Sequence, residues 1–566
     1  MKFWAPELEP KLVSVLRERY TRDRFVSDCF AGVVVGIVAL PLAIAFAIAS
    51  GVRPEQGLFT AIVAGFVISA LSGSRVQIGG PTGAFVALVF LIVERHGYEG
   101  LAVATVMAGV LLVIMGLARL GTAIRFIPYP VTVGFTTGIA IIIAAGQIRD
   151  ALGLRVEALP SEFLAKLRVV AEHGASMDPR ALVLCLGTVV IVQAWPRITR
   201  KVPGSLVAIL ATALAVKWLD LPIDTVGSRF GDVPSSLPVP RIPRVEWHTL
   251  SSLVSPAVSI ALLAGIESLL SALVADGMTG RKHRSNAELV AQGIANMVTP
   301  LFGGIPATGA IARTATNVKN GGTTPIAGIV HALTLVLILA FAGRWAGSIP
   351  MPTLAGILLV VAYNMSEWRV FARLFRGTRS DVLVLLVTFL LTVFVDLTVA
   401  IQAGVVIAAL LLMRRMADVT QVRSIKGQLH YGEGDDPERI SRLDALDDVE
   451  VFSIHGSFCF GAAQKFSEVI SRIESRPRVV VLRMNEVFAM DTTGLHALEE
   501  VVDRFRGEGV TMLLSGVHTQ PLALLRRAGL VDRVGAENVF ESFSGAVARA
   551  ESLSASSRQE GGTDAA

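Results

Sequence analysis

The chain has 566 residues, 52% of them hydrophobic and only 17% charged, and its mean hydropathy is +0.61. Ordinary soluble proteins carry about 25% charged residues, and long runs of this sequence carry almost none, so the composition indicates a polytopic membrane protein and excludes a typical soluble enzyme. The net charge of +5 does not indicate nucleic-acid binding, because the basic residues mostly lie between the apolar runs. Cys29, Cys185 and Cys459 are isolated, which supports neither a disulfide framework nor a metal site, and we expect no cofactor.

Residues 1–27 form a polar segment that is too charged for a cleavable signal peptide, and we expect it in the cytoplasm. Residues 28–415 are expected to form a transmembrane transport domain. Its apolar spans fall into two sets of about seven, a first repeat at about 28–219 and a second at about 253–413. The predicted spans lie near 28–50, 56–72, 82–94, 99–118, 128–146, 180–196 and 203–219, and then near 253–275, 286–302, 308–318, 325–343, 350–363, 381–396 and 398–413.

An odd number of spans in each half makes the two halves inverted repeats, because the second half then starts on the opposite side of the membrane. The loop charges agree, since positively charged loops favour the cytoplasm. We therefore expect a multi-pass protein of the plasma (inner) membrane with both termini cytoplasmic. The basic loop residues are Arg119, Arg125, Arg197, Arg200, Lys201, Arg281, Lys282, Arg284, Arg369, Arg373, Arg376 and Arg379.

One short pattern occurs twice, at Gly79–Phe85 and at Gly303–Ile311, where glycines and a proline precede Thr-Gly-Ala. Gly and Pro break helices, so each copy predicts irregular backbone that leads into a short helix, the third span of each half. Such breaks at matching places in two halves point to the binding site of a transporter. Two helix N-termini that meet near the midplane carry unpaired N–H groups and positive dipole ends, which favour an anion.

Two charged residues lie within apolar spans near these breaks. Arg313 follows the second break by one turn, and a charged side chain in the membrane needs a partner or a water-filled cavity. It is expected to face the anion, or alternatively to reach the interface or fix helix packing. Glu267 is the only charged residue between Val254 and Ala275. Its carboxylate could be a protonation or cation site coupled to transport, or a structural group held by a hydrogen bond or by an ion pair with a residue such as Arg313.

The composition becomes soluble after about residue 415. A linker at 416–444 precedes an expected α/β domain at 445–553 and a disordered tail at 554–566. Strand-helix alternation predicts a largely parallel sheet. The expected strands are 449–454, 479–484 and 510–514, and the expected helices are 461–474, 493–507, 520–528 and 541–553.

Taken together, these stretches resemble the SulP family of anion transporters over nearly the whole chain, and the soluble part resembles that family's STAS domain. The supporting stretches are PLAIAFAIASG (41–51), GGPTGAF (79–85), IPYPVTVGFTTG (127–138), GIESLLSA (265–272), NAELVAQGIAN (286–296), GGIPATGAIARTATN (303–317), GSFCFGAAQKF (456–466) and MDTTGL (490–495).

The resemblance implies seven-plus-seven inverted repeats, a core domain that moves against a gate domain, a homodimer, and an anion held between the third and tenth helices. It implies an anion transporter rather than an enzyme. We expect secondary active transport by alternating access, coupled to protons, with sodium coupling as the alternative. Glu267 is the expected coupling-ion residue. The implied substrate-binding residues are Phe46, Thr82, Gly83, Ala84, Phe85, Ile311, Ala312 and Arg313.

Departures from the family pattern narrow the range of expected substrates. Leu42 replaces a glutamine of many members, and Ala312 replaces a serine, which argues against a sulfate-specific site. Among bacterial members, the stretches ADGMTGRKHRSNAELVAQG and AYNMSEW resemble aerobic C4-dicarboxylate transporters. A C4-dicarboxylate is therefore the first expectation, and sulfate or sodium-coupled bicarbonate are the alternatives.

Two other classes of function stay open from the sequence. An anion channel would need no co-ion gradient. A sensor would use the membrane half as receptor and the STAS domain as output, with the Asp491-Thr492-Thr493 turn as the cue, although simple N-capping of a helix also explains that turn.

Overall fold

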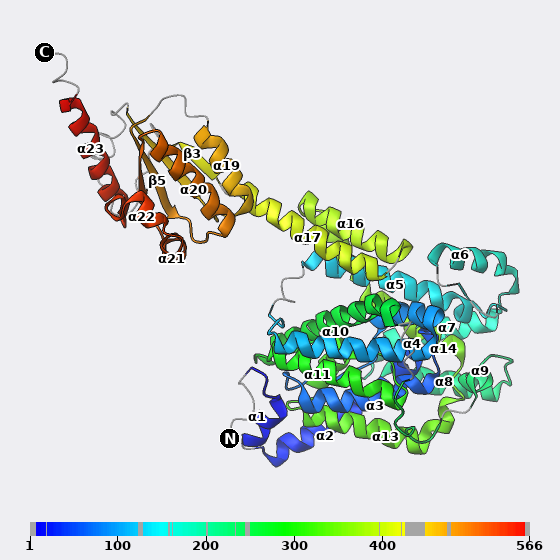
Figure 1. Cartoon of the computed structure of the whole chain (residues 1–566). Helices are drawn as coiled ribbons and strands as arrows, with labels where there is room; N and C mark the ends of the chain where they lie inside the picture. Colours follow the sequence, from blue (N-terminus) through cyan, green and yellow to red (C-terminus); the bar gives the residue numbers. More distant parts are fainter. Residues whose placement is uncertain are drawn as a thin grey trace. The chain divides into compact units, whose positions relative to one another are not determined.

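The computed structural model describes residues 7–18, 20–122, 128–156, 159–160, 162–199, 202–231, 234–243, 250–395, 397–419, 421–424, 448–471 and 477–560. The chain divides into two compact units, Met1–Ala408 and Ala409–Ala566. Figure 1 shows a helical first unit and an α/β second unit, and each is described by itself.

In the described part of the first unit the regular elements are helices, apart from two short strands, β1 (Gly79–Gly80) and β2 (Thr308–Gly309). Seven helices in the described part of the chain are long and apolar enough to cross a membrane. The helices are α1 (Lys11–Arg17), α2 (Arg22–Ala49), α3 (Pro54–Leu71), α4 (Gly83–Leu117), α5 (Tyr129–Leu152), α6 (Phe163–Glu172), α7 (Pro179–Ala194), α8 (Gly204–Trp218), α9 (Val226–Phe230), α10 (Leu250–Thr279), α11 (Ser285–Val298), α12 (Ile311–Lys319), α13 (Ile326–Ala346), α14 (Met351–Met365), α15 (Trp368–Leu374), α16 (Arg379–Phe394) and α17 (Leu397–Val419).

Each predicted span coincides with one of these helices, but two of them share α4. The spans at 82–94 and 99–118 are joined across Gly97, whose φ of 67° and ψ of −177° break the helix. Glycine adopts this conformation without steric cost. Helix α2, which corresponds to the first predicted span, begins earlier than expected, at Arg22 rather than at residue 28. Thr21 caps it, because its side chain accepts a hydrogen bond from the Arg24 amide.

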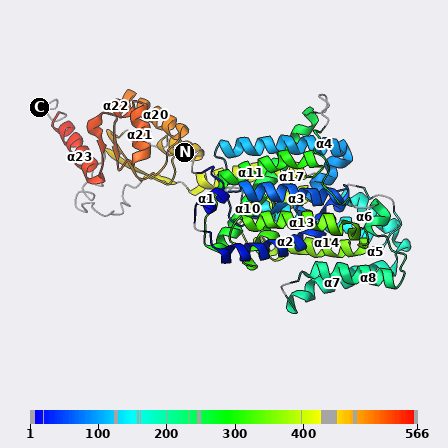
Figure 2. The same ribbon diagram turned by 90° about the horizontal axis from the view of Figure 1, so that it is seen from below.

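The helices of the first unit pack in two groups. One group contains α2, α3, α4, α10, α11, α12 and α13, and the other contains α5, α7, α8, α14 and α16. Figure 2 shows α7 and α8 side by side at the edge of the unit. Glycines allow close approach within the first group: a Cβ on Gly109 of α4 would lie 2.6 Å from the Gly293 carbonyl oxygen of α11, and the reverse distance is also 2.6 Å.

The second unit contains a five-stranded sheet in the order β3-β4-β5-β6-β7. Strands β4 to β7 are parallel and β3 is antiparallel, which confirms the predicted, largely parallel sheet. The elements are β3 (Gln421–Ser424), β4 (Val449–His455), α19 (Phe460–Ser471), β5 (Val479–Glu486), α20 (Thr492–Gly507), β6 (Thr511–Ser515), α21 (Thr519–Arg527), α22 (Leu530–Val534), β7 (Val539–Phe540) and α23 (Phe543–Glu560).

Alternating strand residues cover the two faces of this sheet. Phe452 and Leu482 face a core formed with α19 and α20, whereas Val451 and Val481 face a second core formed with α23. The period of two along each strand produces this division. The sheet therefore has helices on both faces, as parallel sheets require.

Two boundary expectations need correction. Strand β3 and the end of α17 lie within the segment 416–444, which was expected to be a linker. Strand β3 pairs with β4 there, so its backbone groups are satisfied in the sheet. Helix α23 continues through Glu560, so 554–560 is helical rather than a disordered tail, and Ser554 Oγ donates to Asp448 Oδ1 over 2.8 Å. Residues 425–447 and 561–566 lie outside the described residues.

Candidate functional site

The two repeated breaks pair with each other. Strands β1 and β2 are antiparallel, with Gly79 opposite Gly309 and Gly80 opposite Thr308. The Ala310 amide continues the pairing by donating to the Ile78 carbonyl oxygen over 2.8 Å. A Cβ at Gly309 would lie 1.7 Å from Gln77 Nε2, so a larger residue at this position would displace the Gln77 side chain from its hydrogen bond with Ser268. The pairing brings together segments from the two halves of the chain.

Helices α4 and α12 begin immediately after this strand pair. Their N-cap residues, Thr82 and Ala310, form no side-chain capping hydrogen bond with their own helices. The amides of both first turns therefore lack the usual side-chain partner. Two such N-termini beside one another give a region of positive potential that suits an anion.

The Thr82 hydroxyl does not cap α4 but points toward α10. Thr82 Oγ1 donates to Glu267 Oε2 of α10 over 2.9 Å. Among the described residues, Glu267 forms no ion pair, so the expected alternative of a pair with Arg313 is wrong. The carboxylate of Glu267 is thus linked to the first residue before α4 rather than to the arginine of α12.

Arg313 binds the backbone of the first break. Its side chain is buried, with 3% exposure, and its Nη2 donates to the Pro81 carbonyl oxygen. Its Nη1 makes a longer contact of 3.5 Å with the Gly79 carbonyl oxygen. A Cβ on Gly80 would lie 2.5 Å from Nη1, and Gly80 has a φ of +146°. The guanidinium therefore joins the two breaks and does not extend to a membrane interface.

Phe46 of α2 lies beside the N-terminus of α4. A Cβ on Gly83 would lie 3.4 Å from Phe46 Cε1, 3.5 Å from Met365 Sδ and 3.6 Å from Ile143 Cδ1. Ile143 and Met365 were not identified from the sequence, because apolar residues in apolar spans give no distinguishing signal. These three side chains make the surroundings of Gly83 mostly apolar.

The remaining predicted residues fall into two groups. Ala84 and Phe85 are buried at 1% exposure and pack in the hydrophobic core. Ile311 and Ala312, by contrast, are exposed at the start of α12. The structure thus brings together Phe46, Thr82, Gly83, Glu267 and Arg313 around the two helix N-termini, with Ile311 and Ala312 at an accessible edge and Ala84 and Phe85 behind them.

A buried carboxylate that the sequence did not point to, that of Glu288, supports this region. Glu288 of α11 is fully buried and accepts hydrogen bonds from Ser268 Oγ and Gln292 Nε2, each over 2.9 Å, and from Ser72 Oγ. Ser268 also accepts a hydrogen bond from Gln77 Nε2. Glu288 could have been noted as a carboxylate within an apolar span. Its hydrogen-bond partners indicate a structural role behind the strand pair.

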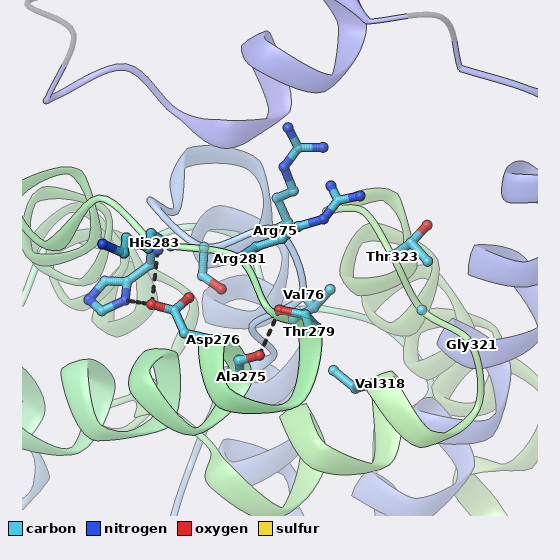
Figure 3. A pocket seen from close by; sticks show the side chains of 13 residues that line it. Arg75, Val76, Ala275, Asp276, Thr279, Arg281, His283, Val318, Gly321 and Thr323 are labelled. Carbon is cyan, nitrogen blue, oxygen red and sulfur yellow. Dashed lines mark hydrogen bonds and ion pairs between the residues drawn. The ribbon is translucent and has the colours of Figure 1, made fainter.

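A separate cavity of about 240 Å³ lies at the C-terminal ends of α10 and α12 (Figure 3). Asp276 accepts hydrogen bonds there from the His283 amide and from its ring nitrogen, at 3.1 and 2.7 Å. Arg75, which also lines this cavity, pairs with Glu18. This cavity lies at the helix ends and shares no lining residue with the predicted anion site.

Comparison with protein-family models gives two matches. The model described as the sulfate permease family matches residues 25–388, and the STAS domain model matches residues 442–546. The chain belongs to the sulfate permease family. As a member of that family it is a multi-pass membrane anion transporter with a C-terminal STAS domain, not an enzyme, and its substrate is a small anion.

Individual relatives cover nearly the whole chain. YvdB of Bacillus subtilis (strain 168), which is named as a candidate sulfate transporter, is 40% identical over 524 residues, which cover 92% of this chain and 97% of YvdB. The bicarbonate transporter BicA of Picosynechococcus sp. (strain ATCC 27264 / PCC 7002 / PR-6) is 30% identical over 524 residues, with coverages of 90% and 91%.

Solved structures of sulfate permease relatives share the fold. Murine solute carrier 26 family member A9 matches with a TM-score of 0.85 at 17% identity, covering 96% of this chain and 94% of that chain. The transmembrane domain of a cyanobacterial BicA matches with a TM-score of 0.61 at 30% identity, covering 69% of this chain and 98% of that domain. The expected fold, a polytopic helical transporter with an α/β STAS domain, is confirmed.

Proposed function

We propose that the chain is a secondary active transporter that holds a small anion between the N-termini of α4 and α12 and moves it by alternating access. The observation that carries this proposal is the pairing of β1 with β2, which brings two side-chain-uncapped helix N-termini together with the buried Arg313. The two positive helix ends and the guanidinium all favour negative charge at one place.

The names of the relatives support sulfate or bicarbonate as substrate, in preference to the C4-dicarboxylate favoured by short sequence stretches. Arg313 is the one cationic side chain among the predicted site residues. A longer dicarboxylate would need a second cationic group for its far carboxylate. Bicarbonate and sulfate are therefore the first substrates to test, and succinate is the third.

Proton coupling has a physical basis in the bond between Thr82 and Glu267. An ionised Glu267 accepts the Thr82 proton, whereas a protonated Glu267 no longer requires this donor. The freed hydroxyl can then donate to an anion at the N-terminus of α4. Binding of a proton and binding of an anion would thus favour each other, as symport requires. Sodium at the same carboxylate is the alternative coupling ion.

The proposed arrangement in the membrane follows the loop charges and the two packing groups. The group containing α2, α4, α10 and α12 would be the mobile core, and the group containing α5 and α14 would be the gate. We expect a homodimer in the plasma membrane with both termini in the cytoplasm. Separate crosslinking and terminal accessibility assays would test these two expectations.

Uptake into proteoliposomes tests the function directly. Labelled bicarbonate, sulfate and succinate should be offered singly, with an inward proton gradient, an inward sodium gradient or neither. We expect uptake of at least one of these anions, accelerated by the proton gradient. Equal uptake without any gradient of co-ion, at a clamped membrane potential, would favour a channel. No uptake of any of the three anions would contradict the proposal.

A further inference from the structure

A larger cavity, of about 600 Å³, lies between the two packing groups at the end of the unit where α2 and α5 terminate. Its walls come from α2, α4, α5, α6, α9 and α16. Ile143 lines this cavity, and its Cδ1 also lies 3.6 Å from the position of a Cβ on Gly83. One apolar side chain therefore reaches from the cavity to the N-terminus of α4. The volume is within the range of about 300–1,000 Å³ that is usual for ligand sites.

The walls of this cavity carry several charged side chains, most of them paired. The lining contains four basic side chains and two carboxylates, and a further carboxylate outside the lining, that of Asp224, accepts from Arg229 Nη2 over 3.0 Å. Asp150 Oδ1 accepts from Arg149 Nε over 3.1 Å and from Arg229 Nη1 over 2.8 Å, so one carboxylate is shared by two guanidinium groups. The basic residues are Arg95, Arg149, Lys166 and Arg229, and the acidic residues are Asp150 and Glu162.

Lys166 of α6 is the unusual member of this set. Its side chain is buried at 6% exposure, and its Nζ lies 5.9 Å from the centre of the Phe90 ring of α4. Among the residues that the structure describes, its ammonium group makes no hydrogen bond and no ion pair, although it carries three donors. Burial of a charge without a partner is costly. Burial accordingly lowers the pKa of Lys166 below its ordinary value, and the carboxylate of Glu94 opposes this change.

We propose that this cavity is a second anion site, in which Lys166 receives a small inorganic anion before the anion reaches the site between α4 and α12. The inference rests on the proposed function and adds to it a binding step on one side of the membrane. A bound anion would supply the partner that the buried ammonium lacks. It would also hold the anion close to Ile143, whose side chain lies between this cavity and the N-terminus of α4.

The chain offers a matched control on the same helix. Arg168 lies two residues from Lys166, but its side chain is 81% exposed and pairs with Glu172. Lys166→Gln and Arg168→Gln each remove one positive charge from α6. Lys166→Arg keeps the charge, so it tests whether a positive charge at this position is enough to keep the KM of wild type. The KM and maximum rate for bicarbonate or sulfate, whichever wild type carries, should be measured from each face of the membrane in vesicles of defined orientation.

We expect Lys166→Gln to raise KM about fivefold from the face that bears α6, with the maximum rate and the opposite-face KM changed less than about twofold. Arg168→Gln and Lys166→Arg should stay near wild type. An unchanged KM in Lys166→Gln, or the same rise in Arg168→Gln, would overturn the proposal. A loss of rate with unchanged KM would assign Lys166 to packing and also overturn it. Uptake by the wild type separates the proposed function from the second anion site. If the wild type transports no anion, both proposals fail. If the wild type transports an anion and Lys166→Gln has an unchanged KM, only the second anion site fails.

Discussion

Thr82 Oγ1 lies 2.9 Å from Glu267 Oε2, and this hydrogen bond joins the N-terminus of α4 to α10 across 185 residues of sequence. It is the direct connection in the described structure between the predicted anion site and its predicted coupling residue. The protonation state of one carboxylate can therefore change the hydrogen bonding of the residue that begins a substrate-binding helix.

Glu267→Gln should abolish the acceleration of uptake by an inward proton gradient. The amide is nearly the same size as the carboxylate and can still accept from Thr82, but it does not titrate. Wild-type uptake should rise as the pH on the uptake side falls, because protonation accompanies anion binding. Initial rates over a range of external pH at fixed membrane potential would measure this. An unchanged pH dependence in Glu267→Gln would remove Glu267 from the coupling mechanism.

Thr82 can be tested with a conservative pair of variants. Thr82→Val preserves shape but removes the donor to Glu267, whereas Thr82→Ser retains it. We expect Thr82→Val to lower the uptake rate about tenfold and to weaken its pH dependence, corresponding to the loss of one hydrogen bond to a charged group. Thr82→Ser should stay within about threefold of wild type. Equal activity of the two variants would show that the hydroxyl has no part in transport.

Arg313→Gln should both destabilise the protein and stop transport. The guanidinium donates to the Pro81 carbonyl oxygen and contacts that of Gly79, so its loss leaves buried acceptors without a donor. Such a loss costs about 1–3 kcal/mol. Arg313→Lys keeps the charge without the planar fork and should recover only part of the activity. The unfolding temperature in detergent and the uptake rate of each Arg313 variant would be measured. Lys319→Gln, which changes an exposed residue at the other end of α12, is the control.

Gly80→Ala should prevent correct assembly of the strand pair. Gly80 has a φ of +146°, and an added Cβ would lie 2.5 Å from Arg313 Nη1. Gly187 of α7 is the matched control, because a Cβ there meets no atom within 4 Å and alanine is favoured in a helix. We expect Gly80→Ala to lower the yield of folded protein severely and Gly187→Ala to leave it unchanged. Size-exclusion profiles and unfolding temperatures would measure both.

Much of this architecture could be predicted from the sequence, because long apolar runs and broken helices are strong signals. The twin motif identified the segments that become β1 and β2, although only the structure revealed that they pair. Thr82 and Glu267 were both expected at the site, yet no pattern in the sequence indicates that they touch. The side-chain register between distant helices depends on packing, which a single sequence does not display.

Other features were hidden for identifiable physical reasons. Arg313 was expected to face the anion, but its hydrogen bonds go to backbone carbonyls, which have no sequence signature. Ile143 and Met365 are ordinary apolar residues in apolar spans. Strand β3 is only four residues long and follows a helix directly, so neither alternation nor turn residues marked it. In each case the deciding interaction was long-range or made by the backbone.

The Cys459 thiol of the STAS domain should react slowly with alkylating reagents. Burial and the carboxylate of Asp491 raise the pKa of Cys459 above its ordinary value, and only the thiolate is nucleophilic. Asp491→Asn removes the charge but can still cap α20 through the Gly494 amide. In a chain with Cys29→Ser and Cys185→Ser, we expect alkylation at pH 7.5 to be about two- to threefold faster in Asp491→Asn.

The exposed residue Asp532 of the same domain gives the control, and Asp532→Asn should leave the alkylation rate unchanged. A thiol with a raised pKa ionises at higher pH. In the chain that keeps Asp491, the alkylation rate of Cys459 should therefore continue to rise with pH beyond the range in which an ordinary thiol has become fully ionised. A slower reaction in Asp491→Asn would contradict this account of the site.

The central claim, that the anion binds at the N-termini of α4 and α12, is tested most directly by substrate protection of a single cysteine. Ala312 is exposed at the start of α12, and Lys319 is exposed at its end. Ala312→Cys and Lys319→Cys would each be made in a chain whose three native cysteines are serine, and alkylated with and without a saturating concentration of the transported anion. We predict at least about fivefold slower labelling of the cysteine at 312 with anion present, and no change at 319. Equal labelling at 312 with and without the anion would contradict the account.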